Sequence, residues 1–181
     1  MDDLRFPIGR FEPQQSYTAQ QRTRFIDEIA ATPQRLRQTV SGLSGEQLDT
    51  PYRPEGWTVR QVVHHVPESH MNAYIRFKLA LTEDQPTIKT YREDAWAKLP
   101  DVAITPIEVS LQLLAALHSR WVDSLGTMKP EDFARTLNHP ERGLLTLDQM
   151  LAMYAWHSEH HLAHITSLHE RMKWKQRAAA V

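Results

Sequence analysis

The 181-residue chain lacks several features that would define a protein class, and each absence narrows the possibilities. It has no cysteine, which excludes disulfide scaffolds, thiolate metal sites and cysteine nucleophiles. Its six glycines are too few for an architecture of strands and tight turns. No segment approaches the roughly 18 uninterrupted apolar residues of a membrane span. Lys and Arg number 21 against 22 Asp and Glu, so no basic field exists to attract nucleic acid.

These absences predict a soluble, cytoplasmic protein with neither a membrane nor a nucleic-acid partner. The opening residues, MDDLRFP, also lack the basic and apolar regions of a signal peptide. The length suits one domain over residues 1–181. Within it, residues 1–16 should form an extended arm and residues 175–181 a frayed tail.

Histidine, in contrast, is abundant and clustered. The chain has ten histidines, and eight of them occur in two short segments. The first cluster is His64, His65 and His70, and the second is His157, His160, His161, His164 and His169. Imidazole is a common metal ligand, so the clusters direct attention to a metal site.

Capping signals place both clusters on helices. Thr58 and Thr146 each precede a capping box and a run of apolar residues at helical spacing, which predicts helices over about 59–83 and 147–172. Thr18 should cap a further helix that Pro33 either kinks or divides, and Thr105 should cap one that ends near Gly126. The pattern predicts an all-α, up-and-down four-helix bundle with short extra helices, one of them starting at a capping box at 44–47. Residues 138–145 could be a loop or a small hairpin.

The last helix contains two pairs of histidines with the four-residue spacing that puts imidazoles on one helix face. On a helical wheel, His157 and His161 lie roughly 50° from the middle of the apolar stripe, whereas His160 and His164 lie about 100° away. Three neutral imidazoles leave the fourth position of a tetrahedral catalytic site open. The inner pair, His157 and His161, is therefore favoured for a metal.

Geometry alone leaves the third ligand open between His65 and His70. His70 points toward the apolar stripe of its helix, while His65 lies on the flank beside polar residues, as expected of a helix that lines a wet cleft. Pro67 should kink this helix or widen a turn, because proline has no N–H to donate to the carbonyl of Val63.

Three segments closely resemble the YfiT branch of the DinB-like superfamily. They are 56–65 (GWTVRQVVHH), 69–78 (SHMNAYIRFK) and 156–165 (WHSEHHLAHI), and the similarity extends from Phe6 to Met172. The resemblance implies a four-helix bundle with one divalent metal per chain, zinc or nickel, held by His65, His157 and His161. Pro67 is a departure from this resemblance, because members of the branch tend to carry an ordinary helix residue at that position.

The resemblance also implies function. The branch carries the label of metal-dependent hydrolases and includes proteins similar to transferases that join bacillithiol, a small thiol, to electrophiles; homodimers are also expected. We favour an S-transferase, because such an enzyme needs no general base: the metal activates the thiol as thiolate. The alternatives are a hydrolase that uses metal-bound water, and a non-catalytic metal-containing bundle that binds a ligand. A fourth protein ligand, His160 or His64, would favour the last.

Several polar residues are candidates for the chemistry around the metal. Glu159 and Glu68 are the candidate bases, although the wheel directs neither convincingly at the metal. Arg76 could bind a substrate carboxylate through its two-pronged guanidinium, or form an ion pair between helices. Asn72 and Gln61 could bind substrate in the cleft or lie on an ordinary helix surface.

Overall fold

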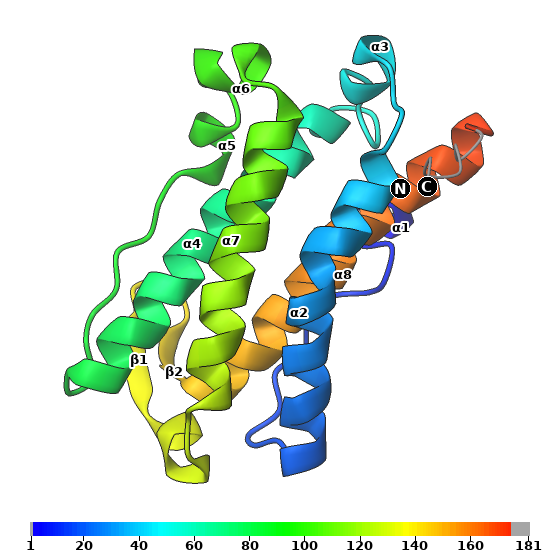
Figure 1. Cartoon of the computed structure of the whole chain (residues 1–181). Coiled ribbons are helices and arrows are strands. Elements are labelled where there is room, and N and C mark those ends of the chain that lie inside the picture. Colours follow the sequence, from blue (N-terminus) through cyan, green and yellow to red (C-terminus); the bar gives the residue numbers. More distant parts are fainter. Residues whose placement is uncertain (1, 175–181) are drawn as a thin grey trace.

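The computed structural model describes residues 2–174, and the predicted frayed tail lies outside this range. Four long helices dominate: α2 (Ala19–Val40), α4 (Val59–Thr82), α7 (Ile107–Gly126) and α8 (Leu147–Met172). The shorter helices are α1 (Asp2–Arg5), α3 (Gly45–Leu48), α5 (Glu93–Trp96), α6 (Pro100–Ile104) and the 3₁₀ helix η1 (Pro130–Ala134). The all-α four-helix bundle is thus confirmed (Figure 1). No helix within residues 2–174 has both the length and the apolar character needed to cross a membrane.

Three of the four long helices begin at the capping boxes that the sequence predicts. Thr18, Thr58 and Thr146 each accept a hydrogen bond from the third residue of the helix, and a glutamine side chain closes each box. The exception is α7, which follows Pro106 without a side-chain cap, so the prediction for Thr105 is wrong. Thr105 instead ends α6 as its C-cap.

Both internal prolines lie within continuous helices. α2 runs through Pro33 as one helix, which settles the question of one helix or two. α4 continues as α-helix through the buried Pro67, so the predicted widened turn is absent between Val59 and Thr82.

The order of the helices differs from a simple up-and-down sequence at one connection. In the contacts between α4 and α7, the residue numbers of both partners increase together, from His64 with Ser110 to Phe77 with Trp121. α4 and α7 therefore run in the same direction (Figure 1). The 83–106 connection, which carries α5 and α6, is long enough to return along the bundle before α7 begins. α2 and α8 are likewise parallel, because Arg22 pairs with Asp148 and Arg35 with Glu159.

The apolar core is divided into two clusters along the bundle axis. One cluster contains Phe77, Trp121 and Leu151, and the other contains Val62, Leu114 and Leu162. The histidines that fall in sequence between the two clusters are His70 of α4, His118 of α7, and His157, His160 and His161 of α8. The bundle thus carries a polar layer across its middle.

The N-terminal arm lies along α8, but it is not extended throughout. Asp2–Arg5 forms the short helix α1, which corrects the expectation of an extended arm over 1–16. Extended chain then runs along α8 (Figure 1). The Arg5 carbonyl accepts a hydrogen bond from His164 at 3.1 Å, and Phe6 stacks on His160. The arm therefore covers the outer pair of α8 histidines.

Residues 136–146 form a β-hairpin, the alternative that the sequence left open. β1 (Thr136–His139) pairs antiparallel with β2 (Gly143–Thr146). Gly143 has a φ of 73°, the left-handed conformation that typically closes a three-residue hairpin loop. The loop places Glu141 and Arg142 next to the middle of α8, where they line a cavity with His157.

Candidate metal centre and adjoining cavity

Three imidazoles from two helices converge at the middle of the bundle. The Nε2 atom of His157 lies 3.4 Å from Nε2 of His65 and 3.2 Å from Nε2 of His161. Ligand atoms of all three residues lie within 4.8 Å of one another. Within residues 2–174, these three form the one group of histidine and acidic side chains with metal-site geometry. The structure thus brings together the three predicted ligands.

The spacing of these nitrogens fits a metal ion better than a network of hydrogen bonds. Nitrogens held about 2.0–2.1 Å from zinc at tetrahedral angles lie about 3.3 Å apart, close to the separations seen here. Nδ1 of His157 is already engaged with His70 at 3.0 Å, so a neutral His157 has one remaining nitrogen for both neighbours. The donor set of three imidazoles suits zinc, nickel, copper or iron.

Helix periodicity and a covering tryptophan position the group. His157 and His161 are one turn apart on α8, and their ring centroids are 4.4 Å apart. His65 faces them from the first half of α4. The Trp57 ring, in the loop before α4, lies 4.6 Å from the His65 ring and 6.4 Å from the His161 ring. Trp57 therefore covers the group on this side, a role that the sequence analysis did not assign.

Burial keeps these imidazoles neutral. The pKa of His65 is lowered to about 4, chiefly by loss of solvation and secondarily by repulsion from His164. Burial and the neighbouring imidazoles also hold the pKa values of His157 and His161 well below the ordinary 6.5. Neutral imidazoles have the lone pairs that a metal requires, so the group is prepared for a cation at neutral pH.

The other clustered histidines have separate partners. His64 bonds to the Ser110 hydroxyl at 2.7 Å. His160 stacks between Phe6 and Trp156, while His164 bonds to the arm. Neither His64 nor His160 joins the metal group, so the described residues supply no fourth imidazole.

A polar cavity of about 170 Å³ adjoins His157. It lies between α4, α8, the α4–α7 connection and the hairpin, and most of its lining side chains can donate or accept hydrogen bonds. They are Ser69, Arg76, Thr90, Tyr91, Glu93, His139, Glu141, Arg142, Met153, Tyr154 and His157. The volume suits a small polar group rather than a large apolar ligand.

Arg76 is the predicted substrate-binding residue that reaches this cavity. Its side chain is buried and donates to the Tyr154 hydroxyl at 3.2 Å and to the Lys89 carbonyl at 3.0 Å. Arg142 lines the same cavity. Burial is the main reason that the pKa of His139 is lowered, and the positive charges of Arg76 and Arg142 lower it further. Arg76 and Arg142 thus bring two guanidinium groups to a cavity that the carboxylates of Glu93 and Glu141 also line.

Asn72 and Gln61 have helix-stabilising contacts instead. Asn72 donates back to the Glu68 carbonyl at 2.9 Å. Gln61 completes the Thr58 capping box and donates to the Ala97 carbonyl at 2.7 Å. Neither lines the cavity beside His157.

The predicted bases are placed apart from the cavity. Glu159 forms an ion pair with Arg35, and burial followed by repulsion from Asp101 raises the pKa of Glu68. The acidic residues that do line the cavity are Glu93 and Glu141, which the sequence analysis missed. They come from a connection and a hairpin loop, where no helical spacing links them to the histidines.

Comparison with known proteins agrees with the fold and the metal group. The family model described as "DinB superfamily" matches residues 28–165. A protein of Bacillus cereus (strain 03BB102) named "Putative metal-dependent hydrolase" is 53% identical over 174 residues, which cover 96% of this chain and 100% of that protein. A relative of the same name in Bacillus mycoides (strain KBAB4) has the same identity and coverage. The solved structure of YfiT from Bacillus subtilis matches with a TM-score of 0.93 and 46% identity over 96% of this chain and 99% of that one. It is described as a probable metal-dependent hydrolase with an unusual four-helix bundle topology.

Proposed function

Because this chain belongs to the DinB superfamily, we propose that it is a metal-dependent hydrolase that acts on a small anionic substrate. The observation that carries the proposal is the junction of the three-histidine group with a cavity lined by arginines and carboxylates. The names of the relatives support hydrolysis over the thiol transfer that the sequence analysis favoured.

Each part of the site has a role in this reaction. His65, His157 and His161 would hold a divalent metal, zinc or nickel, which supplies Lewis-acid activation of a nucleophile. Arg76 and Arg142 bind the negative charge of the substrate and orient it toward His157. Trp57, whose ring lies against His65 and near His161, excludes water from that side of the histidine group.

Glu93 supplies the proton-transfer group that hydrolysis requires. Although Glu93 is an exposed residue, partial desolvation of its carboxyl group, together with the negative charges of Asp94 and Glu141, raises its pKa from the ordinary 4.5. A carboxylate with a raised pKa is a better acceptor for the proton of the attacking water. Glu93 lies in the wall of the cavity that His157 also lines, so both can reach one small substrate.

A thiol S-transferase of the bacillithiol type is the second candidate, and the arginine-lined cavity is the observation that favours it. A small thiol that bears carboxylates would bind Arg76 and Arg142 as a hydrolysable anion does. Transfer to an electrophile needs no carboxylate base, so Glu93 and Glu141 would be dispensable for it.

Metal content and two parallel assays test the proposal. We expect about one divalent ion per chain in the purified protein and loss of that ion in His157→Ala. The loaded protein should hydrolyse small anionic esters or amides, and Glu93→Gln should abolish this hydrolysis. The matched control is His169→Ala, which removes a buried imidazole of α8 that lies outside the metal group.

The same preparations distinguish the two candidate functions. Conjugation of a small thiol to a chromogenic electrophile, at equal rates in wild type and Glu93→Gln, would establish the transferase instead. Stoichiometric metal with neither activity would support the non-catalytic, ligand-binding bundle. Absence of metal from the wild-type protein would overturn the metal centre itself.

A further inference from the structure

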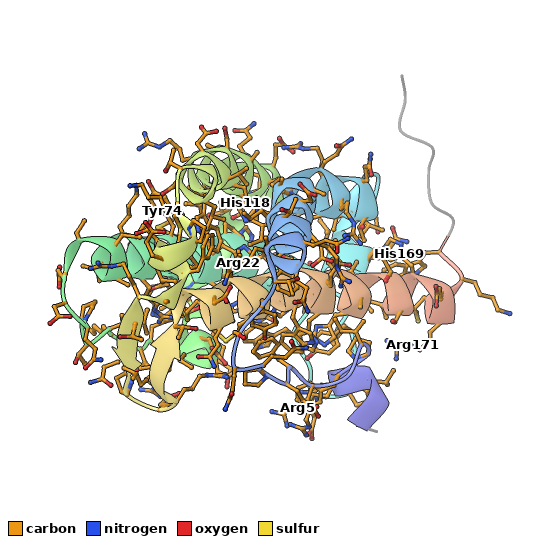
Figure 2. The ribbon with its side chains drawn as sticks, turned by 90° about the horizontal axis from the view of Figure 1, so that it is seen from below. Arg5, Arg22, Tyr74, His118, His169 and Arg171 are labelled. Atoms are coloured by element: carbon orange, nitrogen blue, oxygen red, sulfur yellow. The ribbon has the colours of Figure 1, made fainter. Side chains whose placement is uncertain are left out.

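A row of hydrogen bonds leads from His157 through the bundle to the backbone of α2. Nδ1 of His157 lies 3.0 Å from Nε2 of His70, and Nδ1 of His70 lies 2.8 Å from Nε2 of His118. Nδ1 of His118 lies 2.6 Å from the carbonyl oxygen of Ile29. All four long helices contribute one residue to this row. His118 lies between α7 and α2 (Figure 2).

The carbonyl at the end of the row fixes the direction of every bond in it. A carbonyl oxygen only accepts, so Nδ1 of His118 carries the hydrogen, and Nε2 of the neutral ring is an acceptor. Nδ1 of His70 must then be protonated in order to donate to that acceptor. By the same reasoning His70 accepts from His157 at Nε2, so Nδ1 of His157 is protonated and its own Nε2 is a bare lone pair.

The row is complete when all three rings are neutral. Three imidazoles then carry three N–H hydrogens, and each hydrogen lies in one of the three bonds. The His118 ring is almost fully buried, and burial lowers its pKa to about 4. His70 is fully buried, between the His118 and His157 rings.

We propose that the Ile29 carbonyl, acting through His118 and His70, holds His157 in the tautomer that presents its Nε2 lone pair to the metal. His70 and His118 are thereby positioning residues of the metal centre. This inference rests on the three-histidine group and is independent of the reaction that the site performs. It also explains why His70, which the sequence left open as a ligand, does not join the group: its Nε2 is engaged by His157.

The other helix-α8 ligand has no such support. Nδ1 of His161 is buried without a hydrogen-bond partner among the described residues. Partners that orient a metal-bound imidazole typically contribute 10–100-fold to metal affinity. The row therefore orients His157 more firmly than its neighbour His161.

Nitrogen-15 NMR of the metal-free protein tests the tautomers directly. Long-range ¹H–¹⁵N spectra of histidine-labelled protein at pH 7, with excess chelator, distinguish Nδ1–H from Nε2–H rings. We expect neutral Nδ1–H tautomers for His70, His118 and His157. An Nε2–H tautomer at His157 would overturn the proposal, whether or not the protein binds metal.

Two variants separate hydrogen bonding from packing. His118→Phe keeps a ring against His70 but removes the acceptor for its N–H. We expect mixed tautomers at His157 and an affinity for Zn²⁺, measured by competition with a chromogenic chelator, lowered by about tenfold. In the double variant His70→Gln/His118→Phe, the glutamine oxygen can accept from His157 without help from residue 118. This variant should recover most of the affinity.

Two outcomes would contradict the positioning role. One is an unchanged His157 tautomer and Zn²⁺ affinity in His118→Phe. The other is a double variant that loses as much affinity as the single one, which would indicate packing alone. Circular dichroism and thermal unfolding confirm folding of each variant, and the wild-type spectrum decides the question if a variant does not fold.

Discussion

At the scale of single residues, the histidines differ in what each ring nitrogen contacts rather than in sequence context. His160 and His161 are adjacent on α8, yet the first stacks between aromatic rings and the second faces the metal group. The difference follows from the 100° rotation between consecutive helix residues. One turn along, His164 again turns outward, to the arm. Chemical role is therefore set by helix face.

Arg76 should determine the charge of the substrate. Replacement by alanine should raise KM for a carboxylate-bearing substrate roughly 10- to 100-fold, because a hydrogen bond to a charged group contributes about 1.5–3 kcal/mol. For a neutral amide counterpart of the same substrate, KM should change little. Steady-state kinetics of the metal-loaded enzyme on both substrates measures the difference. Arg60→Ala, which removes a partly buried arginine paired with Asp49 and outside the cavity lining, is the matched control. Equal losses on the two substrates would argue against anion binding.

Sequence reasoning identified the metal group well and the polar residues less well. Helical spacing selected His157 and His161 without knowledge of the fold, whereas the choice of His65 over His70 needed the family resemblance. Gln61 and Asn72 have the polarity expected in a cleft, but the backbone groups of nearby residues engage both side chains. Arg142 and Glu93 could not be found, because neither lies on a periodic element with the ligands.

At the scale of elements, helix starts are the most local features and were the most predictable. Each capping box is complete within four residues, so it needs no tertiary contact. The start of α7 has no such local signal, and it depends instead on the path of the 83–106 connection that precedes it. The hairpin depends on the pairing of 136–139 with 143–146, which residue periodicity over such short strands does not determine.

The caps of α8 and α7 should respond differently to the same substitution. Thr146→Ala removes the acceptor for the Gln149 N–H and should lower the free energy of unfolding by about 1 kcal/mol. Thr105→Ala should lower it by less, because α7 has no side-chain cap. Urea unfolding of the two variants measures both changes. An equal loss in the two variants would contradict the assignment of the helix starts.

At the scale of the whole molecule, the parallel pairs of helices allow the polar layer to form. His64, His70 and Phe77 of α4 follow the same order along the bundle as their partners on α7. In a strictly up-and-down bundle, α7 would run antiparallel to α4, and this common order of partners would be lost. The position of His118 beside His70 thus depends on the long connection, which a sequence pattern alone does not reveal.

Association is a further property at this scale. The family resemblance predicts a homodimer, with a mass in solution of twice the 21.0 kDa of the chain. Size-exclusion chromatography with light scattering measures this mass directly. A mass of one chain over the micromolar range would contradict the prediction.

The many buried histidines should make the metal-free protein sensitive to acid. The pKa of His118 falls from 6.5 in the unfolded chain to about 4 in the folded protein because its ring is buried. Below pH 6.5 the unfolded chain therefore binds more protons, so the stability present above pH 6.5 is lost progressively as pH falls to about 4. For this residue alone the loss amounts to about 3 kcal/mol. Urea unfolding in excess chelator at pH 7.5, 6 and 5 should show the free energy of unfolding falling with pH, and falling less steeply in His118→Phe, which cannot take up this proton. Equal slopes in the two proteins would show that His118 titrates alike in the folded and unfolded states.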